Sequence, residues 1–130
     1  MKDLDTLFAA ARAVRARAYA PYSYFSVGAA LIDENGALHS GCNVENAAYP
    51  VGTCAEAGAI AAMIAGGGRH IMAIAVAGQG LVTPCGACRQ RLREFGRDET
   101  EVHCIDDQAL IKTYVLKYLL PDSFGPHNLA

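Results

Sequence analysis

The middle of the chain carries the run Ile71-Met72-Ala73-Ile74-Ala75-Val76-Ala77, seven apolar residues without a polar interruption. A run of this kind predicts a strand that is buried on both faces, at the centre of a sheet. Helices are predicted on either side of it, over residues 53–65 and 84–95, and a further strand over residues 101–105. This alternation of helix and strand predicts parallel neighbours joined by right-handed crossovers.

The flanking segments complete the predicted fold. A helix is predicted over residues 5–18, capped by Asp3 or Asp5 and broken by Pro21. The dipeptide Asn35-Gly36 favours a tight hairpin between strands over residues 27–32 and 38–43. A last strand is expected over residues 111–114 and a short helix over 115–120. Together these elements predict an α/β protein with a mixed sheet, forming a single domain over residues 1–130.

The composition narrows the class of protein. The chain has 130 residues and no tryptophan, and 24 of its residues are alanine. Small side chains bury little area each, so subunit contacts have room to add stability. A net charge of −2 argues against nucleic-acid binding. We expect no signal peptide, because residues 1–20 contain no uninterrupted apolar region, and no membrane span, because glycines and a proline interrupt the longest uncharged stretch, residues 71–88. The expected location is therefore the cytoplasm.

Five cysteines exclude a fully paired disulfide framework and favour a reducing compartment. The motif Cys85-Gly86-Ala87-Cys88 has three interpretations by itself: half of a zinc site, a redox pair, or two buried thiols. Cys54 favours zinc, because it follows Thr53, a good N-cap, just as Cys85 follows Pro84 at the start of the next helix. Two converging helix starts would then join three thiolates, and three ligands with an open fourth position are typical of catalytic zinc.

Glu56 follows Cys54 by two residues and precedes nine residues of almost wholly apolar helix. An acidic residue at a helix start is common, but a carboxylate entering a buried segment needs a partner or a task. Zinc with three thiolates is net negative and acidifies water weakly, so Glu56 is predicted to act as general acid and base. Cys42 and Cys104 are interpreted as buried packing residues. The four histidines, His39, His70, His103 and His127, are expected to be solvated.

The pairing of Cys54-Ala55-Glu56 with Pro84-Cys85-Gly86-Ala87-Cys88 resembles the signature of the zinc nucleobase deaminases. The segments that share more with the small homotetrameric cytidine deaminases are 20–23, 25–31, 41–49, 84–90 and 119–126. The resemblance implies a three-layer α/β/α sandwich around a five-stranded mixed sheet. It also implies hydrolysis of cytidine and 2′-deoxycytidine to uridine and 2′-deoxyuridine, with release of ammonia, in pyrimidine salvage.

The resemblance also assigns roles to residues. One zinc ion per subunit would bind Cys54, Cys85 and Cys88, while Glu56 would move protons from the water to the ring and to the leaving ammonia. Seven residues would bind the substrate: Phe25 against the pyrimidine, Asn43 and Glu45 at the ribose 3′-hydroxyl, the Ala55 backbone at the base edge, and Ala47, Tyr49 and Phe124 in a neighbouring subunit's pocket. The implied partners are therefore the nucleoside and three further copies of the chain.

One position departs from the family pattern. The family usually has arginine after Cys-Ala-Glu, where its charge offsets the thiolates, and this chain has Ala57. The nearest cation in the sequence is Arg89, beside Cys88. We therefore predict that Arg89, together with the two helix starts, balances the charge of the site.

Three other classes of protein share part of this pattern. A deaminase of the blasticidin S type also lacks this arginine, but the Asn43-x-Glu45 pair and the segment around Phe124 favour plain cytidine. A polynucleotide-editing enzyme would need a basic strip and stacking aromatics, which this acidic chain does not offer. A non-catalytic zinc-stabilised module would need a fourth ligand, for which no histidine is suitably spaced.

Overall fold

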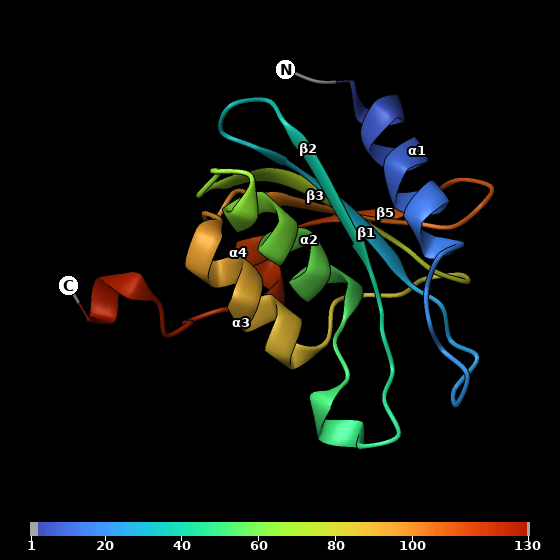
Figure 1. Cartoon of the computed structure of the whole chain (residues 1–130). Coiled ribbons are helices and arrows are strands. Elements are labelled where there is room, and N and C mark those ends of the chain that lie inside the picture. The colour runs from blue at the N-terminus through green and yellow to red at the C-terminus, as the bar shows by residue number, and fades with distance from the viewer. Residues whose placement is uncertain (1–2, 130) are drawn as a thin grey trace.

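The computed structural model describes residues 3–129 and contains one five-stranded sheet (Figure 1). The strands are β1 (Gly28–Asp33), β2 (Leu38–Cys42), β3 (Ile71–Ala77), β4 (Glu101–Ile105) and β5 (Leu110–Val115), in the order β2-β1-β3-β4-β5. β1 is antiparallel to β2 and β3, β3 is parallel to β4, and β4 is antiparallel to β5. The predicted mixed sheet is confirmed, with the apolar run of residues 71–77 as its central strand.

Helices cover both faces of this sheet and give three layers (Figure 1). Helix α1 (Leu4–Arg15) packs on one face, where it contacts β1, β2 and β3. Helices α2 (Ala55–Ala65), α3 (Gly86–Phe95) and α4 (Leu116–Leu119) pack on the other, and short 3-10 turns lie at Tyr49–Val51 and Pro126–Asn128. The predicted α/β/α sandwich is therefore confirmed. No helix among residues 3–129 is long and apolar enough to cross a membrane.

The core is divided by the alternation of side chains along the strands. Toward α2 and α3, β3 presents Ile74 and Val76, whereas toward α1 it presents three alanines.

Glycines allow both helix layers to approach the sheet closely. A Cβ on Gly28 would lie 2.3 Å from the Ala11 carbonyl oxygen of α1, and a Cβ on Gly41 would lie 2.3 Å from the Ala59 backbone nitrogen of α2. Backbone contact therefore fixes the position of both helices.

Several boundaries differ from the sequence-based expectation. Helix α1 ends at Arg15 rather than at residue 18, because Tyr19 exchanges backbone hydrogen bonds with the strand-like segment after β2: its amide donates to Asn43 and its carbonyl accepts from Glu45.

The solvated role expected for His103 is wrong. This histidine is 2% exposed, packs edge-on to Phe8, and shares a hydrogen bond of 2.8 Å with the Thr113 hydroxyl.

The strand register gathers three connections at one end of the sheet. Gly28, the first residue of β1, lies opposite both Cys42, the last of β2, and Ala77, the last of β3. The segments before β1, after β2 and after β3 therefore leave the sheet side by side. Helices α2 and α3 both begin after these segments, so their N-termini lie at the same end.

Candidate metal centre and adjoining pocket

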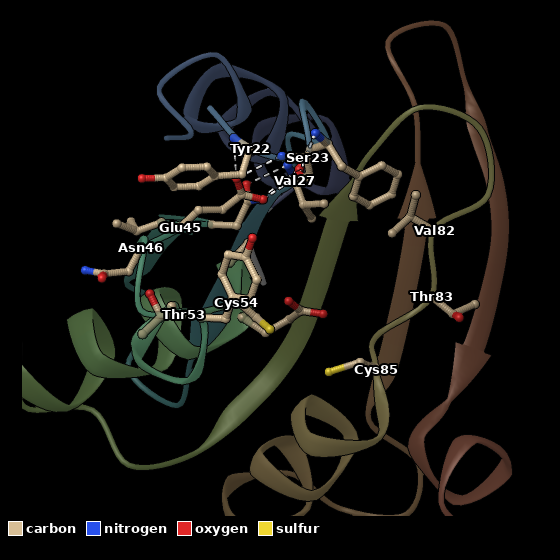
Figure 2. Close-up of a pocket in the computed structure, with 17 residues that line it drawn as sticks. Tyr22, Ser23, Val27, Glu45, Asn46, Thr53, Cys54, Val82, Thr83 and Cys85 are labelled. Atoms are coloured by element: carbon tan, nitrogen blue, oxygen red, sulfur yellow. Dashed lines mark hydrogen bonds between the residues drawn. The ribbon is translucent and has the colours of Figure 1, made fainter. Parts of the chain in front are cut away.

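Three cysteine sulfurs meet where α2 and α3 begin. The Sγ atoms of Cys54, Cys85 and Cys88 all lie within 4.8 Å of one another. Cys54 is the N-cap of α2, Cys85 is the N-cap of α3, and Cys88 follows in the first turn of α3. Figure 2 shows the sulfurs of Cys54 and Cys85 turned toward each other across the pocket. The helices thus begin one residue after Cys54 and Cys85, and the expectation that Thr53 and Pro84 start them is wrong.

The electrostatics of the three thiols suit a divalent cation. Burial raises the pKa of the Cys54 thiol and of the fully buried Cys88 thiol, and the neighbouring acidic groups raise both further. The amide of Cys88 instead holds the pKa of the Cys85 thiol below its usual range. A cluster of mutually repelling thiolates is stabilised by a cation that binds all three. Zinc bound at about 2.3 Å places its sulfur ligands roughly 3.8 Å apart, which this spacing fits.

Glu56 lies beside these sulfurs in the first turn of α2. Its side chain is 4% exposed and lines the pocket next to Cys54 and Cys85. Burial raises the pKa of Glu56, while Cys88 and the positive charge of Arg91 partly oppose that effect. A carboxyl group with a raised pKa holds a proton more readily, so it is able to accept a proton and to return it, as the predicted acid–base role requires.

The pocket in front of the sulfurs has a volume of about 590 Å³, enough for a small heterocyclic ligand with its sugar. Its walls come from the three connections at the end of the sheet and from the start of α2 (Figure 2). The lining residues are Tyr22, Ser23, Phe25, Val27, Asn43, Val44, Glu45, Asn46, Tyr49, Gly52, Thr53, Cys54, Ala55, Glu56, Val82, Thr83 and Cys85.

Asn43 and Glu45 hold the loop that precedes β1. The Asn43 side chain donates to the Phe25 carbonyl at 2.7 Å and accepts from the Val27 amide at 2.9 Å. The Glu45 carboxylate accepts from the amides of Tyr22 and Ser23, at 3.0 and 3.1 Å, and from the Ser23 hydroxyl (Figure 2). The Ser23 hydroxyl lowers the pKa of Glu45. Both side chains therefore shape the pocket wall, whatever else they bind.

The structure brings most of the predicted substrate-binding residues together. Phe25, Tyr49 and Ala55 line the pocket with Asn43 and Glu45, and Tyr49 belongs to the pocket of its own chain. Ala47 and Phe124 are exposed outside it, and the Phe124 carbonyl accepts a hydrogen bond from the Gln90 side chain at 2.8 Å.

The two arginines near Cys88 have different partners. The Arg89 side chain donates to the Pro84 carbonyl at 2.7 Å, to the Leu119 carbonyl at 2.9 Å, and to the Thr83 hydroxyl at 3.3 Å. Among the described residues it is Arg91, and not Arg89, that donates to one of the three thiols. Arg89 thus ties the segment before Cys85 to the end of α4.

Sequence reasoning assigned no role to several lining residues, among them Tyr22, Ser23, Val82 and Thr83. Tyr22 and Ser23 belong to a segment that resembles the deaminases, so a signal existed for them. Val82 and Thr83 precede the Pro84-Cys85 motif, and only the loop's path after β3 brings them to the pocket.

A family model described as the cytidine and deoxycytidylate deaminase zinc-binding region matches residues 1–104. The cytidine deaminase of Sporosarcina psychrophila is 39% identical over 130 residues, covering 98% of this chain and 96% of that protein. The cytidine deaminase of Mycobacterium tuberculosis strain H37Rv is 42% identical over 129 residues, covering 98% of this chain and 93% of that protein.

The solved structures that resemble this chain are also those of cytidine deaminases. The crystal structure of cytidine deaminase from Burkholderia pseudomallei superposes with a TM-score of 0.89 at 44% identity, covering 95% of this chain and all of that one. The corresponding structure from Mycobacterium leprae has a TM-score of 0.83 at 39% identity, covering 94% of this chain and 100% of that chain. Sequence and fold are therefore similar to the same group of proteins over nearly the full chain.

Proposed function

The chain belongs to the cytidine deaminase family of zinc-dependent hydrolases, and on this premise we propose how its pocket carries out the reaction. The reaction adds water at C4 of cytidine or 2′-deoxycytidine and releases ammonia, which leaves uridine or 2′-deoxyuridine. The observation that carries the proposal is the group of three cysteine sulfurs within 4.8 Å of one another, beside a buried carboxyl group at one end of a nucleoside-sized pocket.

Cys54, Cys85 and Cys88 would hold the zinc ion, which when bound would lower the pKa of a water molecule and so supply a nucleophile. Glu56 accepts one proton from the attacking water and delivers it to N3 of the cytosine ring. It then carries the second proton to the exocyclic amino group, which departs as ammonia. Burial supports this role, because the raised pKa of Glu56 makes the carboxylate a better proton acceptor.

The pocket wall orients the nucleoside. Phe25 is half exposed at the pocket surface, where its ring offers the pyrimidine an apolar contact. Asn43 uses one of its two N–H donors on the Phe25 carbonyl, so the other remains for the ribose 3′-hydroxyl. The Glu45 carboxylate keeps further lone pairs to accept from the same hydroxyl. The Ala55 backbone, at the start of α2, binds the base edge.

The charge of the lining favours a nucleoside over a nucleotide. The lining includes the two acidic residues Glu45 and Glu56, and among the described residues it includes no lysine or arginine. A phosphate monoester carries close to two negative charges and would find no positive partner there. We therefore assign cytidine and 2′-deoxycytidine as substrates, rather than their 5′-phosphates.

The active unit is a cytoplasmic homotetramer in which each chain, a single domain of residues 1–130, supplies residues to a neighbouring pocket. Ala47 and Phe124 are the residues assigned to this role, and Tyr49 reaches both its own pocket and the boundary with the next. Two observations support the assembly. Ala47, Tyr49 and Phe124 are exposed, and helix α2 leaves Ala61 and Ala65 uncovered although its sequence is apolar.

The direct test measures zinc content and the fall in ultraviolet absorbance as cytosine becomes uracil. We expect the wild-type protein to hold one zinc per chain and to deaminate cytidine and 2′-deoxycytidine. Glu56→Gln should keep the zinc and lose activity by about 10²–10⁴-fold. The matched control Glu99→Gln, at an exposed position after α3, should leave zinc content and activity unchanged. A wild-type protein that holds zinc without deaminating any cytosine nucleoside would contradict the proposal.

The subunit arrangement has its own test. Phe124→Ala and Glu56→Gln proteins, each nearly inactive alone, are mixed under conditions that exchange subunits. If Phe124 completes a neighbouring pocket, some mixed tetramers combine an intact Glu56 with an intact Phe124 and recover activity. No recovery in tetramers shown to be mixed would contradict the sharing of Phe124.

A further inference from the structure

The thiol cluster gathers negative charge that its ligands and Glu56 do not balance among themselves. Zinc with three thiolates has a net charge of −1, and the ionised Glu56 beside it adds another negative charge in a buried place. Position 57, which follows Glu56 on α2, is an alanine and offers no compensation. Two helix N-termini contribute only partial positive charge, about half a unit each.

Arg91 brings a full positive charge to this cluster. Its Nη1 donates to the Sγ of Cys88 at 3.4 Å. The two residues are three positions apart on α3, so their side chains lie on the same face of the helix. Cys88 is the fully buried ligand, so water stabilises the negative charge on its sulfur least. A hydrogen bond from an ionised donor is strong and spreads the negative charge of the sulfur.

We propose that Arg91 is a positioning residue of the metal centre: by donating to the sulfur of Cys88, its guanidinium balances part of the negative charge of the three-sulfur ligand set and thereby tightens zinc binding. This inference rests on the zinc site proposed above and goes beyond it, because it assigns the charge balance to a residue outside the ligand set and outside the substrate pocket. Arg89, which sequence proximity favoured for that task, has its guanidinium committed to two carbonyls and a hydroxyl.

Arg91 lies close to position 57, where the related proteins usually have arginine. Arg91 and Ala57 both line a surface hollow of about 420 Å³ between α2 and α3. An arginine side chain at position 57 would enter this hollow from α2 and bring its charge beside that of Arg91. The acidic residue that lines the same hollow is Glu94, three positions after Arg91 on α3.

Zinc affinity is the decisive measurement, because it needs neither substrate nor turnover. Each zinc-loaded protein is titrated with a chromophoric chelator of known affinity, and the dissociation constant is taken from the zinc that the protein retains. We expect Arg91→Ala to weaken zinc binding by about 10–100-fold. Arg97→Ala removes the same charge at an exposed position beyond the end of α3 and should leave the dissociation constant unchanged.

Two further variants separate charge from fold. Arg91→Lys, which keeps the charge, should retain most of the affinity, and the double variant Ala57→Arg with Arg91→Ala should recover much of the loss. Thermal melting of each zinc-loaded protein reports whether it folds. The inference is overturned if Arg91→Ala binds zinc as tightly as the wild type, if Arg97→Ala weakens binding equally, or if neither cationic variant restores affinity.

These outcomes are independent of the fate of the proposed activity. A wild-type protein that binds zinc without deaminating cytidine would contradict the proposed function and would leave the comparison of zinc affinities intact. Equal affinities in an active enzyme would contradict only the role of Arg91.

Discussion

The side-chain amide of Asn43, at the end of β2, donates to the backbone carbonyl of Phe25 at 2.7 Å. The same amide accepts from Val27, so one side chain fixes the loop on both sides of Ser26. Phe25, which is assigned to the base, and Asn43, which is assigned to the ribose, therefore belong to one hydrogen-bonded unit.

From this unit we predict that Asn43→Ala raises KM even for 2′,3′-dideoxycytidine, which lacks the 3′-hydroxyl. The variant frees the Phe25 loop, so the position of the base is affected independently of the sugar contact. Steady-state kinetics with cytidine and with the dideoxy analogue measure the two parts. A KM for the dideoxy analogue equal to that of the wild type would show that Asn43 acts on the sugar alone.

The pocket lining is acidic and, among residues 3–129, includes no lysine or arginine, which predicts discrimination against 5′-phosphorylated substrates. We expect kcat/KM for 2′-deoxycytidine 5′-phosphate to be lower than that for 2′-deoxycytidine by about tenfold or more, because like charges face each other across the pocket. Raising the ionic strength should narrow this gap, since salt screens the repulsion. Equal kcat/KM values for the two substrates would mean that the phosphate lies outside the pocket.

Arg89 is predicted to stabilise the fold around the thiols. Arg89→Ala removes donors to three acceptors, two of them backbone carbonyls, and should lower the free energy of unfolding by about 1.5–3 kcal/mol. Arg89→Lys should not restore the lost stability. A single ammonium group cannot reach all the acceptors that the planar guanidinium group of arginine spans. Urea unfolding of the zinc-loaded proteins provides the measurement, with the exposed Arg17→Ala as the control. Equal unfolding free energies for Arg89→Ala and wild type would refute the role.

Asp33, 2% exposed at the end of β1, predicts a pH dependence of stability. The hydrogen bond from His39, 2.8 Å from its carboxylate, holds the pKa of Asp33 below its usual range, and the amides of Ala37 and Asn35 add to this effect. Because the folded pKa lies below the unfolded one, the stabilisation is complete above the ordinary carboxyl pKa and is lost as the pH falls through the folded value.

We therefore expect Asp33→Asn to lower the free energy of unfolding by about 1–3 kcal/mol at pH 7, with a deficit that shrinks below about pH 4. Denaturant unfolding of variant and wild type at both pH values measures the difference. The exposed Asp107→Asn serves as the control. A deficit that is constant with pH would show that charge on Asp33 is not the cause.

The close approach of Gly41 in β2 to the backbone of α2 predicts that the sheet sets the position of this helix. Gly41→Ala places a methyl group 2.3 Å from the backbone of α2, so the helix that carries Cys54 and Glu56 has to move. We expect a loss of about 1–3 kcal/mol in stability together with weaker zinc binding. Gly86→Ala, where an added Cβ meets nothing within 4 Å, should be tolerated in unfolding measurements. A fully stable Gly41→Ala protein with wild-type zinc affinity would contradict this view.

Much of the fold and of the metal site follows from local pattern. The apolar run of residues 71–77 predicted the central strand, and the spacing of Cys54, Cys85 and Cys88 predicted a joint thiol cluster. The helix starts were placed early because Thr53 and Pro84 are favourable residues there, whereas the cysteines themselves occupy the N-cap positions.

The two remaining differences have different causes. Sequence proximity favoured Arg89 as the partner of the thiols, but residues three apart share a helix face, and in the structure Arg91 donates to Cys88. His103 was expected in solvent, yet it is covered by Phe8 of α1, a contact across 95 positions of the chain that no local pattern specifies.

The division of the three thiols between two helices determines when metal capture becomes possible during synthesis. Cys54 leaves the ribosome 31 residues before Cys85, and β3 with its two connections lies between them. A zinc finger assembles its ligands within one short segment, so a nascent fragment of it already binds metal. Here the ion has to wait until the central strand has inserted beside β1 and the second helix has emerged. Metal loading consequently reports that the sheet has formed as far as β3 and that α3 has been synthesised, before β4 and β5 follow.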